Sequence, residues 1–130
     1  MSTNVSMDMT NKEAAVTFLQ MTAAGQVEQA FERFAGPQFR HHNPYFAGDA
    51  AAIKAGMLEN AARFPTMVFE VQRALADGDL VAVHSRARMT PDGADIAIVH
   101  ILRFEGGRIA EMWDIGQAQP DPMPNELGMF

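Results

Sequence analysis

Two runs of residues decide the fold: Ile98-Val99-His100-Ile101-Leu102-Arg103-Phe104 and Ile109-Ala110-Glu111-Met112-Trp113-Asp114. Both are rich in branched and aromatic residues, and Gly106-Gly107 lies between them, a pattern that predicts a β-hairpin. Side chains alternate between the two faces of a strand, so the pairing register determines which residues share a face. The register therefore determines where any chemistry in this hairpin would sit.

One register matches apolar residues on one face and opposite charges on the other. A slip by one residue would set Leu102 against Glu111 and lose both kinds of pair, which are the units that stabilise a sheet. The two glycines permit a loop of two or three residues, so the side-chain pairs carry the prediction. We expect four cross-strand pairs: Phe104 with Ala110, Leu102 with Met112, His100 with Asp114, and Arg103 with Glu111.

The chain has 130 residues, no cysteine and a formal net charge of -6. This length fits one domain, and we expect a flexible N-terminal tail over residues 1–10 and a single domain over residues 11–130. The negative charge disfavours a nucleic-acid partner, and the lack of cysteine excludes disulfides and thiolate catalysis. The first residues have no signal-peptide pattern and no run is long enough to span a membrane, so we expect a cytoplasmic protein without a membrane partner.

The N-terminal half has the pattern of helices. Apolar residues at helical spacing predict one helix capped by Asn11, a second around Val27 to Phe34, and a third that Asp49 caps and Pro65 ends. Between the last two, the segment Arg40 to Pro44 is predicted to be extended, because the residue before a proline is pushed out of the helical region.

The C-terminal half has the pattern of strands. Turn sequences separate four predicted strands: Thr66 to Ala76, Leu80 to Met89, Ala94 to Phe104 and Arg108 to Gln117. Helices followed by a meander predict an α+β fold, with the N-terminal helices packed in a curved antiparallel sheet that forms a cone. The proline-rich tail after these strands should run extended over the surface or across a partner subunit.

Several motifs follow one another in a set order: His42-Asn43-Pro44, Val83-His84-Ser85, Arg103-Phe104, and the run Gly107 to Asp114 followed by Gln117. In this order the sequence resembles the SnoaL-like polyketide cyclase group of the nuclear transport factor two-like superfamily. The resemblance implies the cone-shaped fold, a homodimer, a blind apolar pocket, and no required metal or organic cofactor. Ketosteroid isomerase is similar in architecture, and that similarity places His100 and Asp114 toward the pocket. Two positions depart from the group, Met112 where a histidine is common and His100 where many relatives have an acid.

Asp114 and His100 are the main catalytic candidates. A partly desolvated Asp114 could remove a proton next to a carbonyl while His100 donates a hydrogen bond to the developing enolate oxygen. Burial among apolar neighbours could bring the pKa of each group toward the working pH. The alternative is a buried structural ion pair that satisfies only its own hydrogen bonds.

The remaining candidates rest more heavily on the resemblance. Alternation puts His84 on the more polar face of its strand, which could be solvent, whereas the resemblance makes it a third catalytic residue in the pocket. His41 and His42 should point in opposite directions and cannot chelate one metal ion together. The resemblance selects His42, with Asn43 beside it, for substrate binding; the alternative is a turn with a surface histidine. The expected substrate-binding set is completed by Met112, Leu102 and Tyr45, for which core packing is the alternative.

These candidates lead to two main hypotheses. The first is a SnoaL-like enzyme that acts on an apolar carbonyl compound by cofactor-free acid/base chemistry, as an aldol-type cyclase, isomerase or dehydratase. The second is a non-catalytic binding protein for a small hydrophobic ligand. A third possibility is a dimerising scaffold whose own side chains fill the cone. Fold alone does not decide among them.

Overall fold

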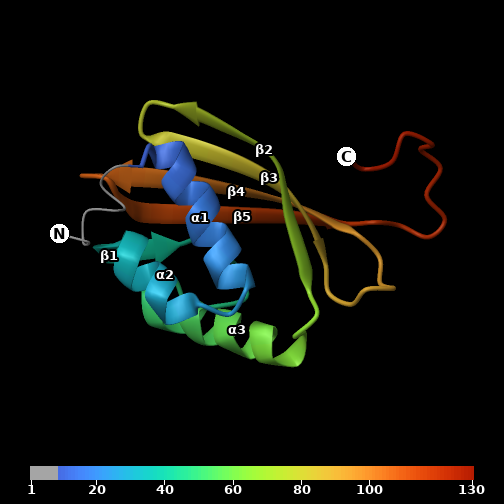
Figure 1. The fold of residues 1–130 in the computed structure, drawn as a ribbon, viewed down its shortest axis with the longest axis horizontal. Coiled ribbons are helices and arrows are strands. Elements are labelled where there is room, and N and C mark those ends of the chain that lie inside the picture. Colours follow the sequence, from blue (N-terminus) through green and yellow to red (C-terminus); the bar gives the residue numbers. More distant parts are fainter. Residues whose placement is uncertain (1–8) are drawn as a thin grey trace.

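The computed structural model describes residues 9–130. Its elements follow one another along the chain as α1 (Asn11–Ala23), α2 (Val27–Phe34), β1 (Ala35–His41), α3 (Ala50–Arg63), β2 (Val68–Asp77), β3 (Leu80–Arg88), β4 (Ile96–Glu105) and β5 (Arg108–Ala118) (Figure 1). The expected α+β layout is confirmed, with helices first and a strand meander after them. None of the helices in this part of the chain is long and apolar enough to cross a bilayer.

The strands form one curved, open sheet in the order β1-β5-β4-β3-β2. The four strands of the predicted meander are antiparallel, whereas β1 adds to the edge of the sheet in parallel with β5. The sequence pattern predicts only an extended segment from Arg40 to Pro44, so this strand begins earlier than expected. Its Pro37 is compatible with an edge strand, where one side of the backbone needs no partner.

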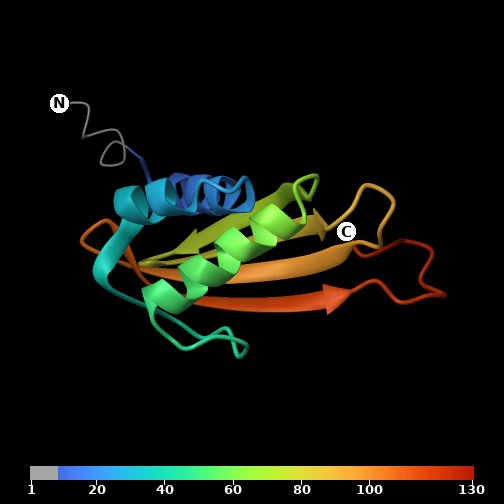
Figure 2. The same ribbon diagram turned by 90° about the horizontal axis from the view of Figure 1, so that it is seen from below.

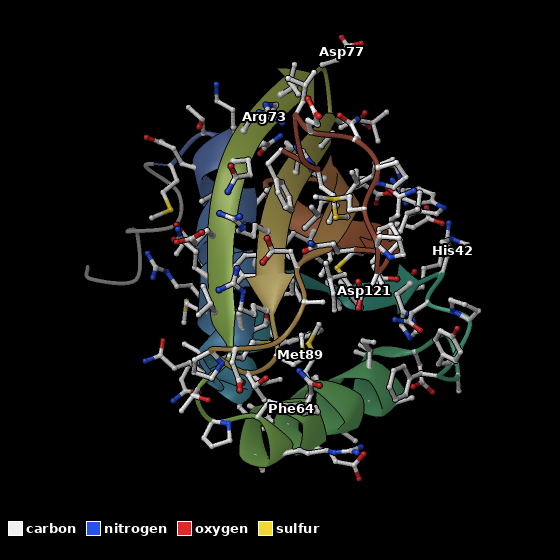
Figure 3. The ribbon with its side chains drawn as sticks, turned by 90° about the vertical axis from the view of Figure 1, so that its right-hand side faces the viewer. His42, Phe64, Arg73, Asp77, Met89 and Asp121 are labelled. Atoms are coloured by element: carbon white, nitrogen blue, oxygen red, sulfur yellow. The ribbon has the colours of Figure 1, made fainter. Side chains whose placement is uncertain are left out.

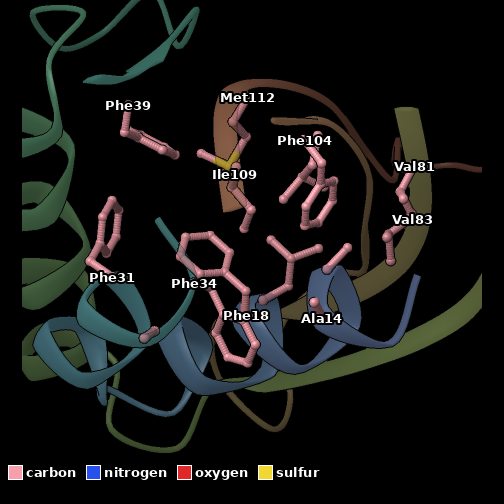
Figure 4. Packing of buried hydrophobic residues seen from close by; sticks show 14 of the residues in the cluster. Ala14, Phe18, Phe31, Phe34, Phe39, Val81, Val83, Phe104, Ile109 and Met112 are labelled. Carbon is pink, nitrogen blue, oxygen red and sulfur yellow. The ribbon is translucent and has the colours of Figure 1, made fainter. Parts of the chain in front are cut away.

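All three helices lie on one face of the sheet (Figure 2). We call this face the inner face and the opposite one the outer face. Inner-face residues of β3, β4 and β5 pack against the aromatic side chains of α1 and α2 (Figure 4). Phe18 stands at the centre, edge-on to Phe31 and Phe34 at ring-centroid distances of 5.1 and 6.5 Å. Apolar burial of this kind is the main source of stability.

The helix starts follow the capping rules, with one correction. Thr10, not Asn11, caps α1, because Thr10 and Glu13 form a reciprocal capping box in which the Glu13 N–H donates to Thr10 Oγ1 at 3.1 Å. Asp49 caps α3 as predicted and accepts from the N–H of Ala52 at 2.9 Å. Apart from its last two residues, the tail expected over residues 1–10 lies outside the described residues.

The β4–β5 hairpin has the predicted register over most of its length. Three of the expected pairs form: Leu102 with Met112, His100 with Asp114, and Arg103 with Glu111. The fourth pair is wrong, since Phe104 lies opposite Ile109 and the register shifts between Arg103 and Phe104. Because of this β-bulge, the side chain of Ile109 points into the core and is fully buried. The predicted register would have placed the smaller Ala110 there. Gly106 and Gly107 both have positive φ, 59° and 80°, as a two-residue hairpin turn requires.

Helix α3 packs differently from α1 and α2. Ile53 is its one fully buried residue, whereas α1 buries Phe18 and Leu19 along with smaller residues. Figure 2 shows α3 on the same face of the sheet as α1 and α2, running obliquely to the strands. Because α3 does not press closely onto the sheet, a hollow remains beneath it.

Candidate functional site

A pocket of about 340 Å³ lies between α3, the loop that follows β1, and the inner face of β4 and β5. One part of its wall is apolar and the rest carries polar or charged side chains. The lining residues are Asn43, Phe46, Ile53, Gly56, Met57, Glu59, Asn60, Arg63, His100 and Asp114. Among residues 9–130, no three potential metal ligands gather at one point.

His100 and Asp114 face each other across β4 and β5 in this pocket. The imidazole packs edge-on against Phe69 at a centroid distance of 6.4 Å, and its Nδ1 is fully buried with no hydrogen-bond partner among the described residues. Burial lowers the pKa of His100 from 6.5 to about 4, and the negative charge of Asp114 opposes that shift only partly. At neutral pH the ring is therefore an uncharged imidazole that can donate one hydrogen bond.

Asn43 holds the carboxylate of Asp114. Its side-chain Nδ2 donates to Asp114 Oδ2 at 3.0 Å, and its Oδ1 accepts from the N–H of Tyr45 at 2.9 Å. The second contact is an Asx turn, so the turn expected at Asn-Pro and the contact with the site coexist. His41 supports this geometry: its Nδ1 accepts from the Asn43 N–H at 3.0 Å and its Nε2 donates to the carbonyl of Ala47 at 2.6 Å.

Residues of α3 and of the preceding loop complete the pocket, and they are not among the predicted site residues. Phe46 packs over α3 at Gly56, where a Cβ atom would come within 2.5 Å of its ring. The signal was present, because a glycine in the middle of a helix costs about 1 kcal/mol and often marks a close approach. Glu59 and Arg63 occupy positions that look like an ordinary solvated helix face.

His42 lies on the opposite side of the sheet edge from Asp114. Its Nε2 lies 2.6 Å from Glu111 Oε2, and its ring stacks on Trp113 at 5.0 Å and 8°. Glu111 and Trp113 belong to the outer face by alternation with Met112, which is buried in the core. Figure 3 shows His42 beside β1, well separated from Phe64 at the end of α3. The structure therefore does not bring His42 into the pocket.

His84 also lies on the outer face, where alternation placed it. Arg73 donates to its Nδ1, and its ring stacks on Phe130 at a centroid distance of 5.6 Å. The guanidinium of Arg86 also lies over the ring of Phe130, 5.0 Å from the ring centroid. The C-terminal tail thus returns to the outer face of its own chain, and His84 is separated from the pocket by the sheet.

Three other predicted binding residues lie outside the pocket lining. Leu102 and Met112 are buried in the hydrophobic core, 0% and 1% exposed, and Figure 4 shows Met112 there. Tyr45 is 86% exposed and contributes its backbone N–H to the Asx turn. The structure therefore brings together Asp114, His100 and Asn43 out of the predicted set.

Residues 15–112 match the family model described as the SnoaL-like domain. The chain belongs to this family. The resemblance seen in the sequence is thereby confirmed, over a range that includes His100 and ends two residues before Asp114. No curated protein matches this SnoaL-like chain in sequence.

Solved structures share the SnoaL-like fold. IdmH, a putative polyketide cyclase from Streptomyces antibioticus, is 21% identical with a TM-score of 0.69, over 84% of this chain and 93% of that one. A putative polyketide cyclase from Acidithiobacillus ferrooxidans is 21% identical with a TM-score of 0.69, over 85% and 89%. An uncharacterized cystatin fold protein from Novosphingobium aromaticivorans is 19% identical with a TM-score of 0.69, over 82% and 98%. At these identities the likeness shows the fold alone.

Proposed function

We propose that this SnoaL-like protein is an enzyme that acts on a small, largely apolar carbonyl compound by acid/base chemistry without a cofactor. The proposal depends on one observation: Asp114 and His100 face each other in a pocket of about 340 Å³ that lies beneath α3. Membership of the SnoaL-like family and the polyketide cyclases among its structural neighbours support a cyclase- or isomerase-type reaction.

Asp114 is the proposed base. Among the described residues its side chain receives one hydrogen bond, from Asn43, which fixes its orientation and leaves carboxylate lone pairs open to the pocket. The carboxylate takes a proton from the carbon next to the substrate carbonyl. The electron pair of the broken C–H bond forms the enolate, whose negative charge develops on oxygen.

His100 is the proposed donor to that oxygen. A neutral imidazole in a buried site offers an N–H that is already in place as the charge develops. The enolate carbon then attacks a second carbonyl in an aldol closure, or takes a proton back at another carbon in an isomerisation. In both cases the proton held by Asp114 returns to the product.

Exchange of α-protons for deuterium tests the first step without knowledge of the natural substrate. The probe is 2-tetralone, a bicyclic aromatic ketone, in D₂O, with loss of the α-proton signals followed by NMR. We expect wild-type protein to accelerate exchange above the buffer rate and Asp114→Asn to remove about 10²- to 10⁴-fold of that acceleration, the usual size of a general-base effect. Glu111→Gln, on the same strand but the outer face, is the matched control and should exchange like the wild type.

Binding of the same ketone distinguishes the alternative of a non-catalytic binding protein. An enzyme whose base is Asp114 should bind 2-tetralone with similar affinity in the wild type and in Asp114→Asn, because the substitution keeps the shape of the side chain. Binding without any acceleration of exchange in the wild type would favour the binding protein. Equal acceleration by both proteins would reject Asp114 as the base.

A further inference from the structure

Two buried polar atoms on the inner face have no hydrogen-bond partner among the described residues: Ser85 Oγ and His100 Nδ1. Ser85 is 0% exposed, so water at the surface does not reach it. A buried polar group without a partner costs about 1–3 kcal/mol, and such groups are rare enough in native proteins to need an explanation.

The sheet register makes these two atoms neighbours. Val83 pairs with His100 and Ser85 pairs with Ile98 across β3 and β4, so Ser85 and His100 are diagonal neighbours on the inner face. Diagonal side chains on one face of an antiparallel pair are within reach of a long side chain such as an imidazole. On the other side of Ser85, its partner Val71 on β2 is apolar. His100 is thus the polar group that the register offers to Ser85.

The protons of the two groups can be assigned by their donor and acceptor capacity. A neutral imidazole has one N–H donor and one acceptor nitrogen, and a serine hydroxyl has one donor. If Ser85 donates to Nδ1, both buried atoms are satisfied and the ring proton lies on Nε2. If Nδ1 carried the proton and donated to Ser85, the hydroxyl proton would have no acceptor among the described residues.

We propose that Ser85 is a positioning residue that donates directly to Nδ1 of His100 after a rotation of its side chain, and so holds the ring as the Nε2–H tautomer. Because Nδ1 is buried while His100 lines the pocket, the Nε2 side of the ring faces the substrate space. The consequence for catalysis rests on the function proposed above: Nε2–H is then the donor that meets the enolate oxygen. Ser85 acts through His100 and does not itself touch the substrate.

Nitrogen-15 NMR of the histidine rings in the ligand-free protein tests the assignment. In the wild type we expect His100 with a protonated Nε2 and an unprotonated Nδ1. Ser85→Ala should lower the ratio of Nε2–H to Nδ1–H tautomers about fivefold, which corresponds to the loss of one hydrogen bond of about 1 kcal/mol. Ser85→Thr keeps the hydroxyl and should restore the wild-type ratio.

The outcomes separate this inference from the proposed function. A wild-type ring protonated mainly on Nδ1 overturns the role of Ser85 even if no variant folds, and an unchanged tautomer ratio in folded Ser85→Ala does the same. Neither result bears on Asp114 as the base. Conversely, failure of wild-type protein to accelerate α-proton exchange would reject the enzyme while leaving the tautomer assignment intact.

Discussion

Glu111 and Asp114 lie on the same strand, β5, yet they have opposite surroundings. Glu111 faces outward and is held by Arg40, Arg103 and His42, with its Oε2 2.6 Å from the ring of His42. These contacts, of which the hydrogen bond from His42 is the largest, lower the pKa of Glu111 to about 2. Asp114 lies in the pocket with a single amide donor and a neutral imidazole opposite.

The difference between the two carboxylates separates a structural role from a chemical one. A carboxylate held by several arginine and histidine donors stabilises the sheet edge and has little tendency to accept a proton. A carboxylate with free lone pairs in a sheltered hollow can accept one from a ligand. Sites with unsatisfied polar groups are where folded proteins depart from local stability rules, and function is the common reason.

Lowering the pH should reduce stability, and the pH range of the loss distinguishes His100 in the pocket from Glu111 on the outer face. Unfolded His100 takes up a proton at its ordinary pKa of 6.5, whereas the folded group does so at about 4. Its contribution to stability is therefore complete above pH 6.5 and falls as the pH drops to 4. We expect the free energy of unfolding to decrease by up to about 3 kcal/mol across this window, as measured by urea unfolding.

The variant His100→Gln supplies the control, because it has no group that titrates there and should give a flatter curve. Glu111 and its partners on the outer face act in a different pH range. The stabilisation from Glu111 is present above pH 4.5 and is lost as the pH falls toward 2. Equal slopes for the wild type and His100→Gln between pH 6.5 and 4 would show that the buried imidazole is not the group responsible.

A smaller effect is expected when the outer carboxylate is neutralised. Glu111→Gln leaves the guanidinium groups of Arg40 and Arg103 without their shared charge partner. Because these arginines are partly exposed, water replaces much of the lost interaction, and we expect a loss of about 1–2 kcal/mol in urea unfolding. Glu105→Gln removes a 68% exposed partner of Arg103 and should cost less than about 0.5 kcal/mol. A similar loss of stability in Glu111→Gln and Glu105→Gln would mean that the burial of Glu111 does not strengthen its ion pairs.

Local patterns predicted much of this fold. Capping residues, turn glycines and alternation gave the helices, the meander and the pair His100–Asp114, because each depends on neighbours in sequence. Only the end of β1 was predicted, as an extended segment from Arg40, since its partner β5 lies at the far end of the chain and nothing local marks the pairing. The bulge at Ala110 was missed for a related reason: it depends on which side chain fills the core best.

The site was predictable where alternation applied and not where a loop or helix supplied the residue. Alternation placed His84 on the polar face, and the structure agrees, whereas the resemblance placed it in the pocket. The path of the loop after β1 decided that Asn43 reaches Asp114 while the adjacent His42 reaches Glu111. Arg63 and Asn60 belong to the pocket only because α3 lies across the sheet, which no local pattern specifies.

Loss of the hydrogen bond from Asn43 to Asp114 should have a modest effect on activity. Asn43→Ala removes the donor to Asp114, and we expect α-proton exchange of 2-tetralone to slow about fivefold, the equivalent of one hydrogen bond. The same substitution also breaks the Asx turn to Tyr45, so Asn43→Asp is the informative partner. An aspartate at this position keeps the turn acceptor but replaces the amide donor with a second negative charge beside Asp114. If the orientation and charge of Asp114 matter, the exchange rate of Asn43→Asp should fall at least as far as that of Asn43→Ala. An exchange rate in Asn43→Asp equal to the wild-type rate would show that Asn43→Ala acts through the broken Asx turn and not through Asp114.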